Sequence, residues 1–595
     1  NMSCQDDFSV LDAQTMRWNF TVPSGMGDNI ALRVCLQMSR KDNALRLSFT
    51  REQSAADKQD QELDEQVPVS LILRPDIDDR SAHSITKAFH GAETRFPQAV
   101  RNKSAQAFEF ALADGHLLHM SCSAGCYSSS PQWSYQIPHR IEAQRGLEPA
   151  ADLFSPGYFR AELTGGQCVH FDAAALLKGS KNKPEQWPKA PAQAKTRELL
   201  DILRDSMQSY VVRRNQHHSV IAGYPWFLDW GRDSLIALRG MISAGMLDES
   251  ADCIREYASL EKDGTLPNTL AGHEIANRDT SDAPLWLFVA VADYLASGAQ
   301  KDFLQTKCKE RSLLDVLLSI AENYLAGSPN GIKTCSESAL VFSPAHYTWM
   351  DTNYPAATPR QGYPVEIQAL WIHALQFLAK YDKQKKWSAL AKKARQSLHQ
   401  YYPAAEMVGF ADCLHAEPGQ PASKAIPDDH CRPNQLLAVT LRALDNHRLE
   451  RQILRATQAL LVPGGIRSLA DQPVQFLLPL QWQGELINDP GKPYWGQYQG
   501  DEDSRRKPAY HNGSAWGWLL PSYCEALYIS FGKSAMLAVE ALHNLSADTL
   551  LKGCLGHLPE ILDGDGPHRI RGCPAQAWSL SELYRVLKLL EKYRN

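Results

Sequence analysis

The spacing of apolar residues changes near residue 195, and this change constrains the fold more than any other feature of the chain. From residue 196 onward, apolar residues recur at intervals of three and four, the pattern of amphipathic helices. The clearest faces are Leu199–Met207, Leu285–Leu295, Leu313–Ile320, Ile367–Leu378, Leu436–Leu444 and Leu580–Leu590. Residues 196–595 have room for about a dozen helices with their loops. We therefore expect an all-α domain built of helical hairpins, with polar and aromatic motifs collected on one rim.

Before about residue 175 the apolar pattern instead has a period of two and is interrupted by polar turns. The segments that carry it are residues 31–36, 44–49, 67–73 and 107–112. Such alternation predicts an antiparallel β-sandwich. Residues 179–195 contain three prolines and little apolar content, which is typical of a linker. We expect a sandwich domain at 1–178, a linker at 179–195 and the helical domain at 196–595.

Composition excludes several classes of function. The 595 residues carry a net charge of −5, which provides no basic field for nucleic acid or anionic lipid. No apolar run is long enough to span a bilayer, and Asn1–Phe20 has no apolar signal core. The 13 cysteines are scattered without a Cys-x-x-Cys pair, so we expect buried thiols in a reducing compartment. These features favour a cytoplasmic protein with no nucleic acid or membrane partner.

The most informative motif reads Gly-Tyr-Pro-Trp-Phe-Leu-Asp-Trp-Gly-Arg-Asp over residues 223–233, directly before a helical pattern. Aromatic faces such as that of Trp230 pack against the C–H faces of sugars. The Arg232–Asp233 pair supplies donors and acceptors for vicinal hydroxyls. Taken alone, the motif is explained more simply by core aromatics and an ion pair at a helix start. Its recurrence along the chain favours a sugar pocket.

A second cluster runs from Asn277 to Trp286 and contains Asp282 at the mouth of a helix. Capping of that helix, with Pro284 in its first turn, is the simple explanation for the carboxylate. A carboxylate beside the Trp286 indole in a closed sugar pocket would instead be partly desolvated. Desolvation raises a carboxyl pKa and suits the group to protonate a leaving oxygen.

A third cluster has Trp349 and Asp351 in Tyr-Thr-Trp-Met-Asp and continues to Arg360 and Glu366 at the start of another helix. A glutamate in the first turn interacts favourably with the helix dipole, and this alone accounts for Glu366. The alternative is that these side chains contribute further contacts to a sugar.

Two later clusters complete the set. His511 and Trp516 lie in Tyr-His-Asn-Gly-Ser-Ala-Trp, and Glu560 follows a proline in His-Leu-Pro-Glu. A loop glutamate can remain ionised and take a proton from water. The simpler interpretation is an acid exposed to solvent.

Motifs for other chemistries are weak or missing. His273-Glu274-Ile-Ala-Asn277 falls one histidine short of a zinc-protease helix. The chain has no Walker loop, no Gly-x-Gly-x-x-Gly and no Gly-x-Ser-x-Gly elbow. We expect no metal and no organic cofactor.

In this order the clusters resemble the glucosidase domain of glycogen debranching enzymes, the amylo-α-1,6-glucosidases of glycoside hydrolase family 133. The resemblance covers about 196–595, and six motifs in the family's order are far more specific than one. The strings that carry it are Trp230-Gly-Arg-Asp233, Ser281-Asp-Ala-Pro-Leu-Trp286, Thr358-Pro-Arg to Val365-Glu-Ile-Gln-Ala-Leu-Trp371, Arg432-Pro-Asn434, Tyr510-His-Asn-Gly513 and Arg571-Gly-Cys-Pro-Ala-Gln-Ala-Trp578. The family is similar to inverting glucoamylases, which implies an (α/α)6 barrel of six helical hairpins, often preceded by a β-sandwich.

The resemblance implies roles for individual residues. It places the general acid at Asp282 and the general base at Glu560, and it matches Arg232 and Asp233 to the pair that holds the 4- and 6-hydroxyls of the terminal glucose. The remaining substrate contacts that we expect are Trp230, Trp286, Trp349, Asp351, Arg360, Glu366, His511 and Trp516.

The chain also departs from the family pattern. Many relatives have Tyr-Asn shortly before the acid, where this chain has Arg278-Asp279, so Asp279 could share a role. Asp563 and Asp565 lie close enough to Glu560 to leave the identity of the base open.

The resulting hypothesis is an inverting hydrolase that removes α-1,6-linked glucose at branch points of glycogen or a limit dextrin. An exo-α-1,4-glucosidase and a non-catalytic glycan-binding protein are the alternatives. The oligomeric state, a homo-oligomer included, is left open by the sequence, as is the preferred branch length.

Overall fold

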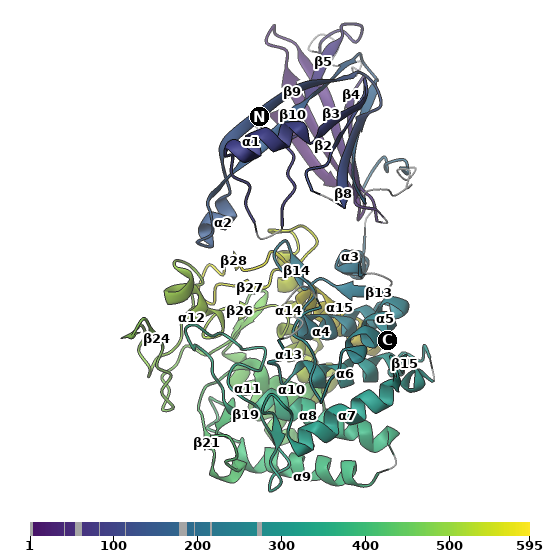
Figure 1. Cartoon of the computed structure of the whole chain (residues 1–595). Coiled ribbons are helices and arrows are strands. Elements are labelled where there is room, and N and C mark those ends of the chain that lie inside the picture. The colour runs from purple at the N-terminus through teal and green to yellow at the C-terminus, as the bar shows by residue number, and fades with distance from the viewer. Residues whose placement is uncertain are drawn as a thin grey trace. The chain divides into compact units, whose positions relative to one another are not determined.

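The computed structural model describes residues 4–40, 42–53, 62–81, 84–113, 115–177, 187–194, 197–214, 217–270, 277–300, 302–382 and 384–594. The chain divides into two compact units, Asn1–Arg197 and Glu198–Asn595. Antiparallel sheet dominates the N-terminal unit and helices dominate the C-terminal unit (Figure 1).

Two antiparallel sheets form the N-terminal unit. One has eight strands in the order β1-β2-β3-β4-β11-β8-β7-β6 and the other has three in the order β5-β10-β9. The strands are β1 Gln5–Val10, β2 Thr15–Pro23, β3 Asn29–Met38, β4 Ala44–Arg51, β5 Val69–Leu73, β6 Val100–Ser104, β7 Ala107–Phe110, β8 His116–Cys122, β9 Cys126–Pro138, β10 Ala150–Leu163 and β11 Cys168–Leu177. The helices α1 (His90–Gln98) and α2 (Arg140–Gln144) lie in the loops between strands. The segments 31–36 and 44–49 fall within β3 and β4, and the segments 67–73 and 107–112 overlap β5 and β7 but extend two residues beyond them, which confirms these predicted strands.

Aromatic side chains from both sheets share one core. Phe108 of β7, Phe159 of β10 and Phe171 of β11 are at most 2% exposed. The ring centroids of Phe159 lie 5.8 Å from Phe108 and 5.6 Å from Phe171. Alternation along each strand therefore places one side-chain face of each sheet in a common apolar layer.

Part of the predicted linker is packed against the larger sheet. A guanidinium nitrogen of Arg17 donates to the Ala192 carbonyl at 2.8 Å, and the Gln37 amide donates to the Pro188 carbonyl at 2.9 Å. Residues 179–186 and 195 of the predicted linker lie outside the described residues.

Thirteen α-helices lie in the described part of the C-terminal unit. They are α3 Leu199–Gln208, α4 Gly231–Ser243, α5 Leu247–Ser259, α6 Ala283–Ala296, α7 Leu313–Ala326, α8 Val365–Tyr381, α9 Lys386–Tyr401, α10 Leu436–Thr440, α11 His447–Gln458, α12 Lys507–Tyr510, α13 Leu520–Phe531, α14 Met536–Thr549 and α15 Ala577–Arg594. The predicted helix over Leu436–Leu444 is wrong beyond Thr440, because Arg442 has φ +56° and ends the helical path.

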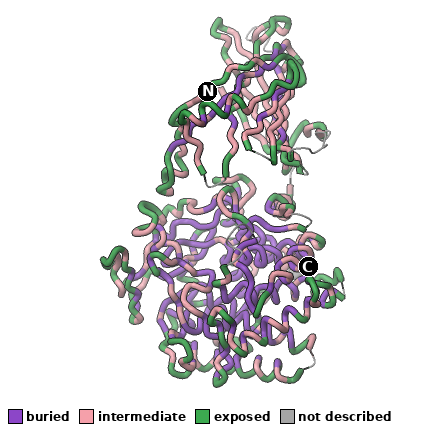
Figure 2. The backbone as a smooth tube through the Cα atoms, in the orientation of Figure 1, coloured by how far each residue is buried: buried purple, intermediate pink, exposed green. Residues whose placement is uncertain are grey.

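Six of these helices contact one another in a closed cycle, α4-α6-α8-α10-α13-α15 and back to α4. Each of α3, α5, α7, α9, α11 and α14 packs against at least one member of this cycle. The helices α4, α6 and α8 are buried on nearly every side, as a helix surrounded by other helices must be (Figure 2). Within the described helices, none is both long and apolar enough to cross a bilayer.

A five-stranded sheet of very short strands positions the Glu560 loop. Its order is β22-β23-β26-β27-β28, made of Leu461–Val462, Gly465–Arg467, Ala515–Trp516, Ile561–Leu562 and Ile570–Arg571. Trp516 pairs with Ile561 in this sheet. The backbone of Ile561 is therefore fixed by strand pairing, and Glu560 is the residue directly before it.

Candidate active site

The guanidinium of Arg232 connects the start of α4 to the start of α6. Its Nε donates to Oδ2 of Asp282 at 2.7 Å, and Nη1 donates to Oδ2 of Asp351 at 3.2 Å. Asp282 is 1% exposed and Arg232 is 9% exposed. A buried, charge-assisted pair of this kind fixes both side chains in orientation.

Asp282 occupies the N-cap position of α6, but its side chain makes no capping hydrogen bond. Oδ1 accepts instead from the hydroxyl of Thr280 at 2.7 Å, and the Thr280 hydroxyl accepts from the Ala283 amide at 3.3 Å. Capping therefore does not account for the carboxylate. Both of its oxygens are engaged, one by Arg232 and one by Thr280.

Asp351 lies on the other side of the Arg232 guanidinium. Its side chain is 43% exposed, yet the surrounding protein raises its pKa by desolvation, opposed by the charge of Arg232. Asp351 is therefore accessible to a ligand, unlike the buried Asp282.

Asp233, next to Arg232 in the first turn of α4, is 8% exposed and accepts a hydrogen bond at 3.1 Å from the Gln576 amide. Burial raises its pKa to about 7, against the opposing charge of Arg232. The charges of Glu560 and Asp351 add to the rise. Asp233 thus links the Asp282 side of the cluster to Glu560.

Glu560 is 3% exposed, so it is not the solvent-exposed loop acid of the simpler interpretation. The Tyr510 hydroxyl donates to its Oε1, and the backbone amide of Cys573 donates to Oε2 at 2.8 Å. A Cβ on Gly572 would lie 2.3 Å from Oε2, and Gly572 has φ +61°. Only glycine therefore fits the backbone that passes beside this carboxylate.

The other carboxylates near the predicted acid and base have partners of their own. Asp563 accepts from the Tyr498 amide at 2.8 Å and from Arg571 at 3.0 Å. Asp565 accepts from the Tyr494 hydroxyl at 2.8 Å. Asp279 is exposed and accepts from the Tyr347 hydroxyl at 2.8 Å. Glu560, Asp563 and Asp565 all accept hydrogen bonds, so these contacts alone do not select the base.

Three of the predicted aromatic contacts lie in the core below this cluster. Trp286, Trp349 and Trp516 are at most 3% exposed. The Trp349 indole donates to Asn434 at 2.7 Å, and its ring meets Trp516 edge-on at 5.0 Å. Their burial favours support of the site over a sugar contact. Trp230 is half-buried at the N-cap of α4 and is the better candidate for a sugar platform.

His511 is buried and neutral. Its pKa is lowered well below the ordinary value by burial and by the charges of Arg432 and Arg232. Nδ1 lies 2.6 Å from the Thr352 hydroxyl, while Nε2 has no hydrogen-bond partner among the described residues. His511 is 1% exposed, so its burial, like that of Trp349 and Trp516, favours support of the site over a sugar contact.

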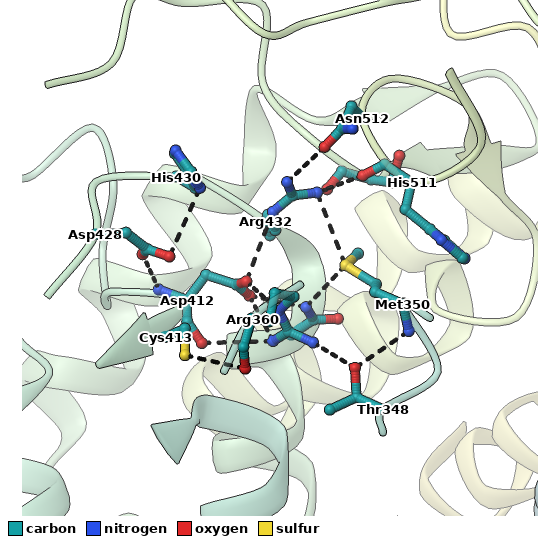
Figure 3. Close-up of polar contacts among 12 residues, drawn as sticks. Thr348, Met350, Arg360, Asp412, Cys413, Asp428, His430, Arg432, His511 and Asn512 are labelled. Atoms are coloured by element: carbon teal, nitrogen blue, oxygen red, sulfur yellow. Dashed lines mark hydrogen bonds and ion pairs between the residues drawn. The ribbon is translucent and has the colours of Figure 1, made fainter. Parts of the chain in front are cut away.

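Arg360 is part of a buried ionic network with Asp412 and Arg432 (Figure 3), and Glu366 pairs with the same Arg360 guanidinium. Arg360 forms a bidentate pair with Glu366 at 2.5 and 2.6 Å and a second pair with Asp412 at 2.6 and 3.1 Å. Arg432 binds Asn512 at 2.7 Å and lies 3.6 Å from Asp412. Arg360 and Glu366 are at most 4% exposed, so their placement favours a scaffold role over the predicted sugar contacts.

Two residues that matter here were not among the predicted site residues. Tyr510 directly precedes His511 in the motif Tyr-His-Asn-Gly, so the sequence offered a reason to include it among the site residues. Asp412 stands in Phe-Ala-Asp-Cys, far from every motif, and only the fold brings it to Arg360.

Within the described residues, no group of three or more histidine, cysteine and acidic side chains is arranged to hold a metal ion. His273 and Glu274 of the incomplete zinc motif lie outside the described residues.

Comparison with known proteins identifies the family. Residues 205–585 match the family model of amylo-α-1,6-glucosidase, and residues 3–170 match that of the glycogen debranching enzyme N terminus. The glycogen debranching enzyme of Saccharomyces cerevisiae is 23% identical over 470 residues, covering 61% of this chain but only 29% of the yeast protein. The chain therefore belongs to the glycogen debranching enzyme family and carries its amylo-α-1,6-glucosidase domain, which makes it a glycoside hydrolase.

Proposed function

We propose that the protein is an inverting glucosidase that removes α-1,6-linked glucose from branch points of glycogen or a related α-glucan. The observation that carries this proposal is that both candidate proton-transfer groups are buried carboxyls with fixed partners. Arg232 and Thr280 hold Asp282, while Tyr510 and the Cys573 amide hold Glu560. Two carboxyl groups with different partners on either side of a sugar site are what glycoside hydrolysis needs.

In the proposed mechanism, Asp282 donates its proton to the glycosidic oxygen as the bond to C1 breaks. Glu560 takes a proton from a water molecule whose oxygen bonds to C1 from the opposite face. The products are β-glucose and the debranched chain, and the two carboxyls then exchange the proton through solvent. This single displacement requires carboxyl groups about 6.5–9.5 Å apart.

Asp233 and Arg232 are proposed to hold the terminal glucose. Ionised Asp233 can accept hydrogen bonds from two sugar hydroxyls, while the Gln576 amide orients it. Arg232 also orients Asp282, so binding of the glucose and protonation of its glycosidic oxygen are coupled through one guanidinium.

The proposed architecture is a β-sandwich at 1–178, a linker at 179–195 and an (α/α)6 barrel at 196–595. The closed cycle of six helices, each with an outer neighbour, supports the barrel. The buried free thiols of Cys253, Cys413 and Cys431 support a cytoplasmic location.

The stereochemistry of the first product tests the mechanism. Proton NMR of a digest of branched dextrin should show β-glucose before mutarotation, and α-glucose would exclude inversion. Relative rates on isomaltose-type branched dextrin and on maltooligosaccharides separate the debranching activity from an exo-α-1,4-glucosidase. A complete absence of turnover on both would favour a glycan-binding protein.

A further inference from the structure

The start of α6 leaves no amide for the side chain of Asp282 to cap. An N-cap side chain ordinarily accepts from the second or third amide of its helix. The second residue of α6 is Pro284, which has no N–H. The third amide, that of Leu285, donates to the backbone carbonyl of Asp282 at 2.9 Å. The carboxylate of Asp282 is therefore released from the helix end that it precedes.

Thr280 takes the amide that remains among the first three residues of α6. Its hydroxyl oxygen accepts from the amide of Ala283, the first residue of the helix, at 3.3 Å. The same hydroxyl donates to Oδ1 of Asp282 at 2.7 Å. A threonine hydroxyl has one proton to donate, and here that proton is directed at the carboxylate. Thr280 thus binds the helix end in place of Asp282 and orients the Asp282 side chain at the same time.

The backbone between Thr280 and Asp282 is held on both sides. The amide of Ser281 donates to the Tyr347 carbonyl at 2.7 Å, and the carbonyl of Ser281 accepts from the Tyr324 hydroxyl at 3.0 Å. Thr280 and Ser281 are fully buried. A buried hydroxyl on a fixed backbone keeps its orientation, so the contact with Asp282 is a permanent part of the site.

We propose that Thr280 is a positioning residue for proton donation by Asp282. The inference rests on the proposed hydrolysis, in which Asp282 gives its proton to the glycosidic oxygen as the bond to C1 breaks. The negative charge left on Asp282 is then shared by Oδ2, which Arg232 holds, and Oδ1, which Thr280 holds. Thr280 itself neither gains nor loses a proton. A hydrogen bond to the charged form favours that form, so the hydroxyl assists the step in which the charge appears.

An effect of this kind depends on the leaving group. The sugar alcohol released from a dextrin needs a proton from the enzyme, whereas a strongly acidic leaving group departs without one. Loss of the Thr280 hydroxyl should therefore slow hydrolysis of the dextrin and spare the activated substrate. Because Thr280 is fully buried, it offers the sugar no contact, and KM should not change.

Steady-state kinetics of the intact chain on a branched dextrin and on a glucoside with a strongly acidic leaving group test the proposal. Thr280→Val keeps the shape of the side chain without its hydroxyl, and Thr280→Ser keeps the hydroxyl. Thr457→Val is the matched control. Thr457 is also fully buried, and its hydroxyl donates to the Ile453 carbonyl at 2.8 Å within α11.

We expect Thr280→Val to lower kcat on the dextrin by about tenfold to a hundredfold. On the activated glucoside the loss should be less than about threefold, with KM unchanged on both substrates. Thr280→Ser should retain most of the rate on each substrate, and Thr457→Val should match the wild type. Equal losses of Thr280→Val on the two substrates, or a similar loss in Thr457→Val, overturn the proposal. Thermal unfolding identifies any variant that fails to fold, and Thr280→Ala replaces the valine variant in that case.

Asp282→Asn separates this inference from the proposed function. A large loss on the dextrin in Asp282→Asn, with none in Thr280→Val, overturns the role of Thr280 and leaves the hydrolase intact. If Asp282→Asn is as fast as the wild type, or the wild type releases no glucose, the proposed function fails and this inference fails with it.

Discussion

The hydroxyl of Tyr510 donates a hydrogen bond to one carboxylate oxygen of Glu560, while the Cys573 amide donates to the other. Burial raises the pKa of Tyr510 well above its ordinary value, and the charge of Glu560 adds to this effect. The phenol therefore remains a donor at every pH at which the enzyme would work. Two fixed donors set the plane of the carboxylate and direct its remaining lone pairs.

Replacing Tyr510 with phenylalanine should lower kcat by roughly tenfold to a hundredfold and leave KM nearly unchanged. A hydrogen bond to a charged group contributes about 1.5–3 kcal/mol, and the base loses its orientation when that bond is removed. Steady-state kinetics on a branched dextrin measure the effect.

The control for this substitution is Tyr363→Phe. Tyr363 is also buried, and its hydroxyl donates to the Gln420 carbonyl at 2.7 Å instead of to a carboxylate of the site. It should lower thermal stability without lowering kcat. Equal losses of kcat in both variants would show that Tyr510 only supports the fold.

The acid and the base can be distinguished by the leaving group. Asp282→Asn and Glu560→Gln should each lower kcat on a natural dextrin by about 10²–10⁴. A glucoside with a strongly acidic leaving group needs no proton from the enzyme, so Asp282→Asn should recover most of its rate there. Glu560→Gln should remain slow on both substrates, and the opposite pattern would reverse the two roles.

Asp233 should make folding stability fall as pH rises. Burial raises its pKa to about 7, whereas an unfolded aspartate titrates near pH 3.9. The folded chain therefore binds the proton more tightly, and its stability decreases between about pH 4 and pH 7, by at most about 1.4 kcal/mol per pH unit. Urea unfolding at pH 5 and pH 7.5 should show a smaller decrease in Asp233→Asn than in the wild type. Parallel decreases would contradict the assignment.

Glu366→Gln tests whether Arg360 and Glu366 support the fold or bind sugar. Removing one partner of a buried ion pair costs about 3–5 kcal/mol, so the free energy of unfolding should fall by an amount of that order while KM of the folded enzyme is retained. The control is Glu322→Gln, which breaks a surface pair with Lys386 in which Glu322 is 46% exposed. That pair should contribute less than about 1 kcal/mol. A raised KM with unchanged stability would restore the sugar-contact interpretation.

Periodicity predicted four of the eleven strands of the N-terminal unit and six of the thirteen described helices of the C-terminal unit, those whose buried face recurs most regularly along the chain. It could not predict which charged residues would meet. Arg232 and Asp282 are 50 positions apart, and Arg360 and Asp412 are 52 apart. The packing of α4 against α6 brings the first pair together, and the pairing of β19 (Gly362–Pro364) with β20 (Cys413–His415) brings the second.

The aromatic motifs did not distinguish residues that would line the proposed site from residues that pack in the core behind it. Trp349 and Trp516 were expected to face a sugar, but they pack on each other in the core. The local sequence around a tryptophan is the same whether its ring faces a ligand or packs in the core. The exposed fraction of the side chain, 43% at Asp351, separates the two cases, and that fraction depends on tertiary packing.

Gly572→Ala should lower activity mainly by displacing Glu560. The added methyl would lie 2.3 Å from Oε2 of Glu560 and 2.9 Å from Cγ1 of Ile561, and the shorter contact forces the carboxylate to move. We expect kcat to fall at least about tenfold with little change in KM, since a displaced base loses near-attack geometry. Gly553→Ala is a matched control, because Gly553 has φ +63° against +61° for Gly572, and its methyl would meet only Ile570, at 3.2 Å. Both variants carry similar backbone strain, so a selective loss of kcat in Gly572→Ala isolates the effect on Glu560, and equal kcat in the two would exclude Glu560 as the base.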